Sequence, residues 1–500
     1  MKPIGEIIKD KPWVGWVLFF GTLIIVFLLG LLASSVVERR AEAVFAYTPQ
    51  VEHEQWDPRL EVWGMNYPRQ YESYLKTADT TFESKYYGAR KIDMLAEAPE
   101  MVVLWAGYAF SKDYRQGRGH MWAIDDVQKT LRTGSPMEPE DGPMPGTCWT
   151  CKSPDVPRVM DKIGIAEFYN STLSELGPEI VNPIGCADCH DAKTMALQIT
   201  RPALIEAFER QGRDITEASH QEMRSLVCAQ CHVEYYFQKE GNYLTFPWDK
   251  GYSMEDMESY YDEYGFVDWT HALSRAPMIK AQHPDYEIFR FGVHYDRGVS
   301  CADCHMPYKS EGGVKFTNHH IQSPLNNVAN TCGVCHREDA EKLVENVYQR
   351  QDAIHQTRTL LEEVLAKAHI EAKFAWDKGA TEEQMENVLK YIRGAQWRWD
   401  YVAASHGASF HAPFESARVI ALGLEKAQEA RLEVSRVLAD LGYSREIPIP
   451  DISTKSKAQE FIGLNMKELN SEKQVFLDKV VPRWLEEAKQ READYPTTNL

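Results

Sequence analysis

All ten cysteines of this 500-residue chain fall into five Cys-x-x-Cys pairs. Histidine follows four of the pairs, and lysine follows the fifth, which reads CWTCK. The pattern Cys-x-x-Cys-His is the attachment motif of a c-type heme, in which both thiols bind the porphyrin and the histidine ligates the iron. The paired cysteines are Cys148 and Cys151, Cys186 and Cys189, Cys228 and Cys231, Cys301 and Cys304, and Cys332 and Cys335. The residues that follow the pairs are Lys152, His190, His232, His305 and His336.

Cys-x-x-Cys pairs also occur in zinc sites and in thiol–disulfide redox sites. A zinc ribbon needs two pairs for each metal, however, and five pairs do not divide that way. The pairs also use every cysteine, so none is left for a disulfide elsewhere. The pattern therefore predicts a multiheme cytochrome with five heme c groups. Four ordinary motifs are typical of an electron-transfer chain, whereas an amine ligand from Lys152 marks one heme as the place of chemistry.

The histidine count agrees with this division of labour. A heme that only transfers electrons needs a second strong axial ligand, because six-coordinate iron reorganises little on reduction. Four such hemes require four histidines beyond those in the motifs, and the chain has 16 histidines in all. The supply permits the scheme but does not choose the residues. The heme ligated by Lys152 is expected to keep its other face open for a substrate.

The composition is that of a globular protein, with 44% hydrophobic and 11% aromatic residues. The net charge of -19 argues against nucleic acid as a partner, because its phosphates would be repelled. A small anionic substrate is not excluded. Cationic residues around a cleft can attract an anion locally despite the charge of the whole molecule.

The N-terminal segment predicts a membrane location. Pro12 to Val37 holds no charged residue and is long enough to span a bilayer as a helix. A cleavable signal peptide has a shorter apolar region of roughly 7–15 residues, although Ala41-Glu42-Ala43 could serve as a cleavage site. We favour an uncleaved anchor within residues 1–43. In either case the rest of the chain is expected on the periplasmic side of the cytoplasmic membrane, where heme c is attached.

The segments that must position the motifs are predicted to be mainly α-helical. Residues 44–100 mix aromatic and charged residues and are expected to cap the heme region. Residues 101–340 hold all five motifs, with clusters of proline and glycine but no sustained alternation of apolar and polar residues. Short helices and loops packed around five hemes, with little sheet, are therefore expected.

After Cys335 the chain is rich in Ala, Leu, Glu, Lys and Arg, with apolar residues at helical spacing. The predicted helices run from about Glu338 to Asp377, Thr381 to Val402, Ser416 to Leu441 and Ser456 to Arg491. Pro448 and Pro450 separate the last two. We thus divide the chain into an N-terminal anchor or signal segment (1–43), a pentaheme catalytic region (44–340) and a long-helix region (341–500). The long helices form either a scaffold over the hemes or a dimer interface.

Further motifs accompany the heme-attachment sites. These are RGH (Arg118–His120), TLRTG (Thr130–Gly134), CHVEY (Cys231–Tyr235), KAQH (Lys280–His283) and FHAP (Phe410–Pro413). Together with CWTCK and four CxxCH motifs in this order, they make the chain resemble the pentaheme cytochrome c nitrite reductases of the ammonia-forming type. The resemblance covers roughly residues 95–415. It implies the six-electron reduction of nitrite to ammonium and a membrane-bound tetraheme quinol dehydrogenase as the electron donor.

The resemblance also implies the second axial ligands. His120 would serve the heme at Cys228 and Cys231, and His294 the heme at Cys332 and Cys335. The heme at Cys186 and Cys189 would take His319, with the adjacent His320 as the alternative. The heme at Cys301 and Cys304 would take His411, with His406 as the weaker alternative.

Three catalytic residues are implied on the open face of the Lys152 heme: Arg132, Tyr235 and His283. Nitrite is an anion that must lose both oxygens as water. Arg132 and a protonated His283 could hold the anion and stabilise charge that develops on oxygen as the N–O bonds break. His283 could also donate protons near neutral pH, and Tyr235 could donate a hydrogen bond or a proton.

A calcium site is implied at Glu234, Tyr235, Lys280 and Gln282. Calcium prefers oxygen ligands, such as carboxylates, amide oxygens and main-chain carbonyls. A charged lysine side chain cannot bind it, so Lys280 and Tyr235 would contribute their carbonyl oxygens. A cation there would fix the neighbouring catalytic side chains and add positive potential for an anion.

Two other functions are compatible with the motifs. A related multiheme enzyme could act on sulfite or hydroxylamine, although hydroxylamine oxidation normally requires more attachment motifs than this chain has. A non-catalytic multiheme electron carrier would instead have five six-coordinate hemes. Lys152 and the implied trio of Arg132, Tyr235 and His283 argue against the carrier.

Overall fold

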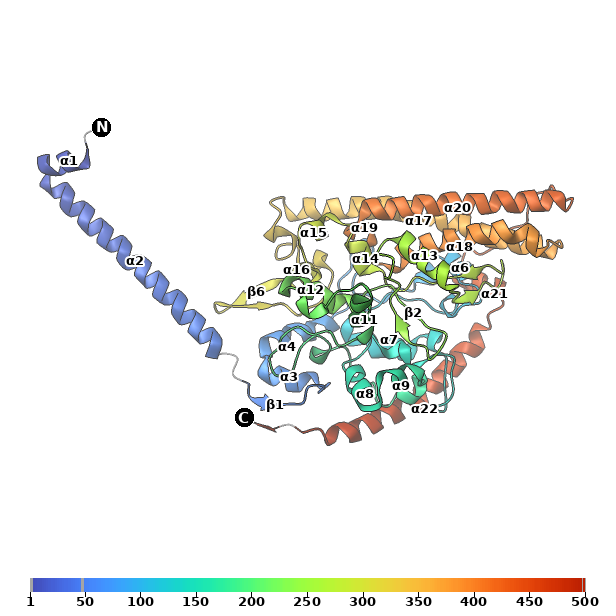
Figure 1. The fold of residues 1–500 in the computed structure, drawn as a ribbon, viewed down its shortest axis with the longest axis horizontal. Helices are drawn as coiled ribbons and strands as arrows, with labels where there is room; N and C mark the ends of the chain where they lie inside the picture. The colour runs from blue at the N-terminus through green and yellow to red at the C-terminus, as the bar shows by residue number, and fades with distance from the viewer. Residues whose placement is uncertain (1–2, 46–48, 497, 500) are drawn as a thin grey trace.

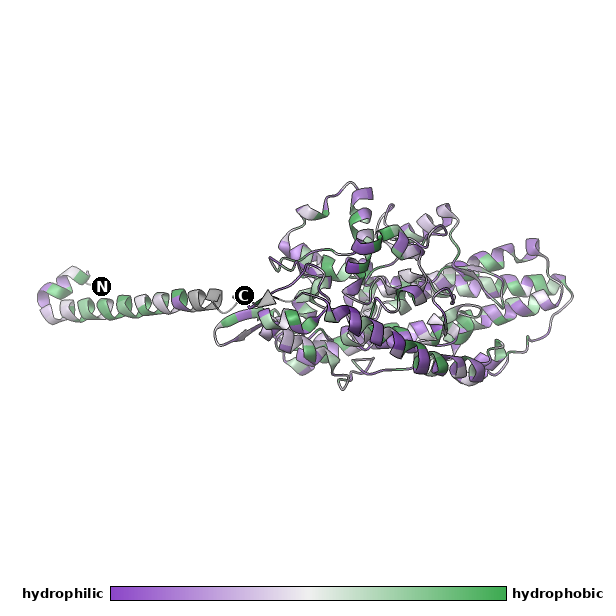
Figure 2. Cartoon of the chain, turned by 90° about the horizontal axis from the view of Figure 1, so that it is seen from below, coloured by the Kyte–Doolittle hydropathy of each residue, from purple (hydrophilic) through white to green (hydrophobic). Residues whose placement is uncertain are grey.

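The longest apolar run of the sequence forms α2 (Pro12–Phe45), which projects away from the rest of the molecule (Figure 1). The structure, a computed structural model, describes residues 3–45, 49–496 and 498–499. The predicted ranges 1–43, 44–340 and 341–500 also include residues 1–2, 46–48, 497 and 500, which lie outside the described residues. Pro12–Glu38 is long and apolar enough to cross a membrane. Consecutive apolar residues are exposed around this helix, such as Trp16–Phe20 and Leu23–Leu29, and Figure 2 shows it hydrophobic along most of its length. This pattern is typical of a helix surrounded by lipid.

Three long helices lie side by side along one edge of the molecule (Figure 1). They are α17 (Ala340–Asp377), α18 (Glu382–Ala404) and α20 (Pro413–Asp440), and each lies within a few residues of its predicted range. Gly423 lets α20 approach α17 closely, because a Cβ there would lie 2.8 Å from the Leu361 side chain. The prediction of long C-terminal helices is therefore confirmed.

The fourth predicted helix, Ser456 to Arg491, is not continuous. The structure divides it into α21 (Lys455–Phe461) and α22 (Met466–Ala493). Gly463 lies between them with a φ of 82°, a left-handed conformation that favours glycine. Asn465 then caps α22 by accepting a hydrogen bond from the main-chain nitrogen of Glu468 (3.3 Å). Gly463 and Asn465 thus end one helix and begin the next, although the amino-acid composition of the whole segment favours helix.

The region that holds the attachment motifs consists of short helices, turns and two-stranded antiparallel pairs, so the mainly α prediction is confirmed. The strand pairs are β1 (Val51–Glu52) with β8 (Thr498–Asn499), β2 (Tyr236–Phe237) with β3 (Leu244–Thr245), β4 (Trp269–Thr270) with β5 (Pro277–Met278), and β6 (Tyr308–Glu311) with β7 (Val314–Thr317). The remaining α-helices are α1 (Ile4–Asp10), α3 (Leu60–Asn66), α4 (Pro68–Leu75), α5 (Met94–Glu97), α6 (Glu100–Leu104), α7 (Ala123–Lys129), α8 (Asp155–Ile163), α9 (Ile165–Asn170), α10 (Leu173–Leu176), α11 (Pro202–Arg210), α12 (His220–Ala229), α13 (Met254–Tyr264), α14 (Asp285–Phe289), α15 (Val293–Asp296), α16 (Cys301–His305) and α19 (Ala408–His411).

One apolar core joins the motif-bearing region to the long helices. The ring of Trp105, which follows α6, lies 5.3 Å from that of Trp399 in α18. Tyr261 of α13 contacts Trp397 in the same helix, with ring centres 5.5 Å apart. The predicted regions 44–340 and 341–500 are therefore packed against each other. That a domain boundary lies between residues 340 and 341 stays a prediction.

Candidate heme and substrate site

A cavity of about 2220 Å³ runs through the motif-bearing region. All ten cysteines line it, together with Lys152 and the four motif histidines. Small-molecule pockets are usually about 300–1,000 Å³, so this cavity has room for several large groups. Thioether attachment at five motifs needs such a shared space, and the residues present therefore fit the hemes that the motifs predict.

Each motif histidine faces a second histidine across the cavity. The separations of the ring centres are 6.1 Å for His190 and His319, 6.4 Å for His232 and His120, 6.3 Å for His305 and His411, and 6.3 Å for His336 and His294. Two imidazoles that ligate one metal from opposite sides, each through a bond of roughly 2 Å, hold their rings about this far apart. The four separations agree closely, although the segments that supply the histidines are unrelated.

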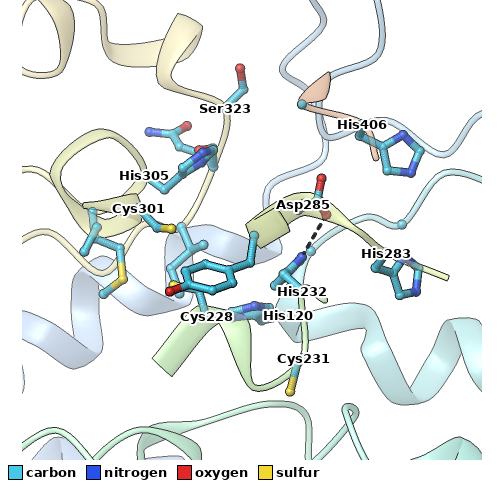
Figure 3. Close-up of a pocket in the computed structure, with 18 of the residues that line it drawn as sticks. His120, Cys228, Cys231, His232, His283, Asp285, Cys301, His305, Ser323 and His406 are labelled. Carbon is cyan, nitrogen blue, oxygen red and sulfur yellow. Dashed lines mark hydrogen bonds and ion pairs between the residues drawn. The ribbon is translucent and has the colours of Figure 1, made fainter. Parts of the chain in front are cut away.

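Three of the four motif histidines have a partner within 3.5 Å of Nδ1. In His190 and His305 this atom lies 2.9 Å from a main-chain carbonyl oxygen. In His232 it lies 3.5 Å from Asp285 Oδ2 (Figure 3). Metal-binding histidines typically donate the other ring N–H to such a group, which fixes the tautomer and the ring plane. Nε2 is thereby left for a metal.

The alternatives for two distal histidines differ in position. His319 lies opposite His190, whereas its neighbour His320 contacts Asn318 through the main chain. His411 lies opposite His305, whereas the ring of His406 lies against Tyr87, with ring centres 5.6 Å apart. Burial lowers the pKa of His319 and of His411 to about 4, so both imidazoles are neutral. Of the two candidates in each case, the structure thus places His319 and His411 opposite a motif histidine.

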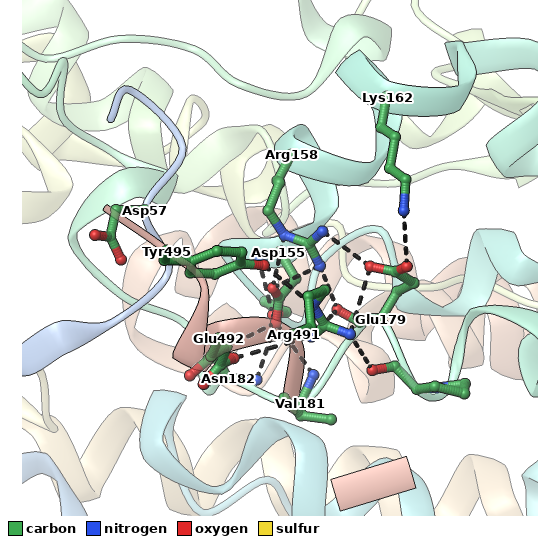
Figure 4. Close-up of polar contacts among 12 residues, drawn as sticks. Asp57, Asp155, Arg158, Lys162, Glu179, Val181, Asn182, Arg491, Glu492 and Tyr495 are labelled. Atoms are coloured by element: carbon green, nitrogen blue, oxygen red, sulfur yellow. Dashed lines mark hydrogen bonds and ion pairs between the residues drawn. The ribbon is translucent and has the colours of Figure 1, made fainter. Parts of the chain in front are cut away.

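The turn that presents Lys152 is anchored at both ends. Before it, Trp149 is fully buried and donates from Nε1 to the Leu173 carbonyl (2.9 Å). After it, Asp155 begins α8 and is also fully buried. Asp155 pairs with Arg158 (3.0 Å), and Figure 4 shows this pair within a network that extends to the end of α22.

Arg132, Tyr235 and His283 line the same cavity as Lys152. The Arg132 guanidinium lies over the ring of Phe110, 4.3 Å from its centre, and the Arg132 turn follows α7. Tyr235 follows the CAQCH motif, and its ring centre is 6.4 Å from that of His283. Three segments that are distant in sequence thus meet at the cavity wall.

The electrostatics of this group differ from the sequence expectation in one respect. Burial lowers the pKa of His283 well below its ordinary value, so the imidazole is neutral while no anion is beside it. Burial also raises the pKa of Tyr235 well above its ordinary value, so the hydroxyl keeps its proton. His283 is therefore expected to be protonated only when a bound anion stabilises the imidazolium.

The four residues of the implied calcium site are neighbours. Gln282 donates its main-chain N–H to Glu234 Oε2 (2.6 Å), and its side-chain amide lies 3.3 Å from the Lys280 carbonyl oxygen. The Lys280 ammonium points to Asp400 (2.8 Å), which leaves its carbonyl for another partner. Burial raises the pKa of the fully buried Glu234 carboxyl well above its ordinary value. A cation would offset this penalty, and one carboxylate with carbonyl oxygens is a donor set that suits calcium.

Three residues near the site, of which Lys473 and Arg201 are buried, were not predicted from the sequence. Asp285 orients His232. It stands two residues after His283, and the sequence His283-Pro284-Asp285 could have revealed it as a polar neighbour of the site. Lys473 of α22 donates from Nζ to the Gln128 carbonyl (3.1 Å) on the Arg132 loop. Lys473 and Arg201, whose contacts are described below, carry no local motif that would have revealed them.

A model of the family described as cytochrome c552 matches residues 59–493 of the chain. This chain is a member of the cytochrome c552 family. The family expected from the motifs is thereby confirmed, and a cytochrome c552 carries heme c. Cytochrome c-552 of Bacteroides fragilis is 61% identical over 482 residues, which cover 96% of this chain and 98% of that protein.

A more distant relative and a solved structure extend the comparison of this cytochrome c552. Cytochrome c-552 of Maridesulfovibrio salexigens is 46% identical over 485 residues, 94% of each chain. The catalytic subunit of cytochrome c nitrite reductase from Desulfovibrio desulfuricans is a solved structure described with two calcium sites. It is 31% identical, with a TM-score of 0.74, and the match covers 83% of this chain and 90% of that one.

Proposed function

We propose that this cytochrome c552 is an oxidoreductase that reduces nitrite to ammonium. The observation that carries the proposal is the convergence of Arg132, Tyr235 and His283 on the cavity that also holds Lys152. The solved relative is itself a nitrite reductase. The reaction takes up six electrons and eight protons and releases ammonium and two waters. A site for it must therefore hold an anion, receive electrons and deliver protons.

The protein residues divide these tasks. Cys148, Cys151 and Lys152 would hold a heme c, which would supply the electrons and an iron that can bind the anion. Arg132 holds the anion and stabilises negative charge on oxygen as the N–O bonds break. His283 takes up a proton when the anion raises its pKa and passes it to a departing oxygen. Tyr235, which keeps its own proton, donates a hydrogen bond to the substrate.

Ammonium production from nitrite with a low-potential chemical donor tests the proposal. The wild type should form one ammonium for each nitrite, and Arg132→Ala and His283→Ala should each lose about 10²–10³-fold in kcat/KM. Arg436→Ala, at a 60% exposed side chain, and His355→Ala, outside the cavity lining, serve as matched controls. If the wild type forms no ammonium while all its hemes are reducible and low-spin, the chain is an electron carrier. If the protein turns over sulfite or hydroxylamine but not nitrite, it is instead a related multiheme enzyme that acts on that substrate.

The proposed cofactors are five heme c groups and one calcium ion. The ring separations above support His120, His294, His319 and His411 as the distal ligands. The contacts among Glu234, Lys280 and Gln282 support the calcium site, with the Tyr235 carbonyl as its fourth ligand. Dialysis against a calcium chelator should lower kcat and added calcium should restore it, whereas Glu234→Gln should not respond to calcium. A protein mass that corresponds to a number of hemes other than five would contradict the proposed five heme c groups.

The proposed location is the periplasmic face of the cytoplasmic membrane, with α2 as the anchor. The length and apolarity of Pro12–Glu38 support it.

The proposed electron donor is a membrane-bound tetraheme quinol dehydrogenase. The proposed assembly is a homodimer formed through the long helices. Leu360 on α17 and Leu432 on α20 are 47% and 46% exposed, which supports pairing of these faces. Sedimentation of Leu432→Asp, compared with the wild type, tests the dimer.

A further inference from the structure

The segments that carry three of the attachment motifs meet at one buried arginine, Arg201, which directly precedes α11. Its side chain is 1% exposed. Arg201 Nε donates to the main-chain oxygen of Thr150 (2.6 Å), and Nη2 donates to that of Ser153 (3.0 Å). These two carbonyls stand on either side of Cys151 and Lys152 in the sequence. One guanidinium therefore spans the turn that presents the lysine.

The same guanidinium pairs with Asp188, which lies between the two cysteines of the next motif. Asp188 is 3% exposed, and its second oxygen accepts from the Gly185 main-chain N–H (2.7 Å). A buried ion pair is maintained only where further hydrogen bonds satisfy both partners. The main-chain carbonyls of the lysine turn provide them for the arginine.

Gln230, between the cysteines of the third motif, completes the network. Its Oε1 accepts from the main-chain N–H of Thr200 (2.9 Å) and of Arg201 (3.2 Å). Its Nε2 donates to the Asp188 carbonyl (3.0 Å). We call Asp188, Thr200, Arg201 and Gln230 the motif hub. Through it, CWTCK and the CADCH and CAQCH motifs that follow it are hydrogen-bonded to one another.

We propose that Arg201 is a positioning residue, which fixes the Lys152 turn against the next two attachment motifs and so sets the orientation of the lysine ligand. The proposal rests on the proposed heme attachment at these motifs, but not on the identity of the substrate. Arginine suits the task because its planar fork directs donors to two carbonyls and a carboxylate at once. Lysine, with a single ammonium, can keep the charge but not all three contacts.

Arg201→Gln removes the charge and the fork while keeping a polar side chain. We expect it to retain five hemes but to change the absorption and electron paramagnetic resonance signals of the Lys152 heme before any substrate is added. The potential of that heme should fall, because a nearby positive charge is lost. The kcat for nitrite should fall roughly 10–100-fold with KM little changed, since Arg132 and His283 remain in place. Arg201→Lys should restore the potential more fully than kcat.

Asp188→Asn is the second variant, because it keeps the shape of the side chain and removes only its charge. The potential of the neighbouring hemes should then rise, opposite to the effect of Arg201→Gln. General damage to the fold would not produce shifts of opposite sign. If Arg201→Gln loses a heme, Asp188→Asn carries the test alone.

Arg398→Gln is the matched control, since Arg398 of α18 is also buried (7% side-chain exposure) and pairs with Glu258 of α13, away from the attachment motifs. It should lower thermal stability without changing the spectra or the potentials. If Arg201→Gln and Asp188→Asn also leave the spectra, potentials and kcat at wild-type values, the proposal is wrong and the hub only stabilises the fold. The spectra and potentials need no nitrite, so a wild type that forms no ammonium would overturn the proposed function and leave this test intact.

Discussion

Each histidine that faces a motif histidine across the cavity comes from a different segment of the chain. His411 lies across the cavity from His305, whereas His406 lies against Tyr87. We therefore expect His411→Ala to convert one low-spin heme to high spin, as seen by electron paramagnetic resonance and absorption spectra. His406→Ala is the matched control and should keep the wild-type spin states. A spin change in the control alone would assign the ligand to His406.

Lys473 gives the chain a pH-dependent stability above neutral pH. Its side chain is 4% exposed, and burial lowers its pKa from 10.5 to about 8. The unfolded state then binds more protons than the folded state between these two pH values, so stability rises as the pH increases from about 8 to about 10.5.

Lys473→Met should lack this rise. The difference in unfolding free energy between wild type and variant is expected to change by at most ~3 kcal/mol over that window. Denaturant unfolding at both ends of the window measures it. A difference that does not depend on pH would show that Lys473 titrates normally.

The residues that could be predicted from the sequence are those that stand in motifs of fixed spacing. The cysteines, Lys152 and the KAQH segment belong to this class, because their chemistry requires neighbours in the chain. Arg201 could not be predicted, since its partners are main-chain carbonyls and motif side chains that only the folded chain brings together. The neutral state of His283 was likewise not visible, because the desolvation that lowers its pKa arises only in the folded cavity.

At the scale of elements, α22 runs along the outside of the motif-bearing region (Figure 1). Its Trp484 is 1% exposed and packs so closely on Gly177 that a Cβ there would lie 2.5 Å from the indole ring. Trp484→Ala should therefore destabilise the protein by about 3–5 kcal/mol. Leu485→Ala, at the next and 49% exposed position, should change stability by less than about 0.5 kcal/mol. Thermal unfolding of both variants tests this; equal effects would mean that α22 is not held through Trp484.

The long helices were predictable because composition and apolar spacing agree over many turns. The break between α21 and α22 was not predicted, because Gly463 and Asn465 act over a single turn inside a segment of helical composition. The short helices of the motif region have no periodicity of their own. Their ends follow the cavity and the contacts of the attachment turns, which the sequence alone does not specify.

At the scale of the whole molecule, the apolar helix α2 projects away from the body that holds the attachment motifs (Figure 1). Removal of residues 1–45, with a cleavable export signal in their place, should release the protein into the soluble periplasmic fraction with its nitrite turnover intact. The full-length protein should stay in the membrane fraction, and its intact mass should include residues 1–43. A full-length protein recovered soluble and shortened would instead identify the segment as a cleaved signal peptide.

The position of α22 also has a consequence for how the protein matures. This helix contacts the Arg132 loop through Lys473, and at its other end Arg491 donates to the Pro178 carbonyl (2.7 Å), beside the network that begins α8. It follows all five attachment motifs in the chain. The Arg132 loop and the segment that leads from Pro178 to Val181 therefore receive these contacts only after the motifs have been synthesised. The order of synthesis thus separates the appearance of the cysteines from the bracing of the segments that flank Lys152.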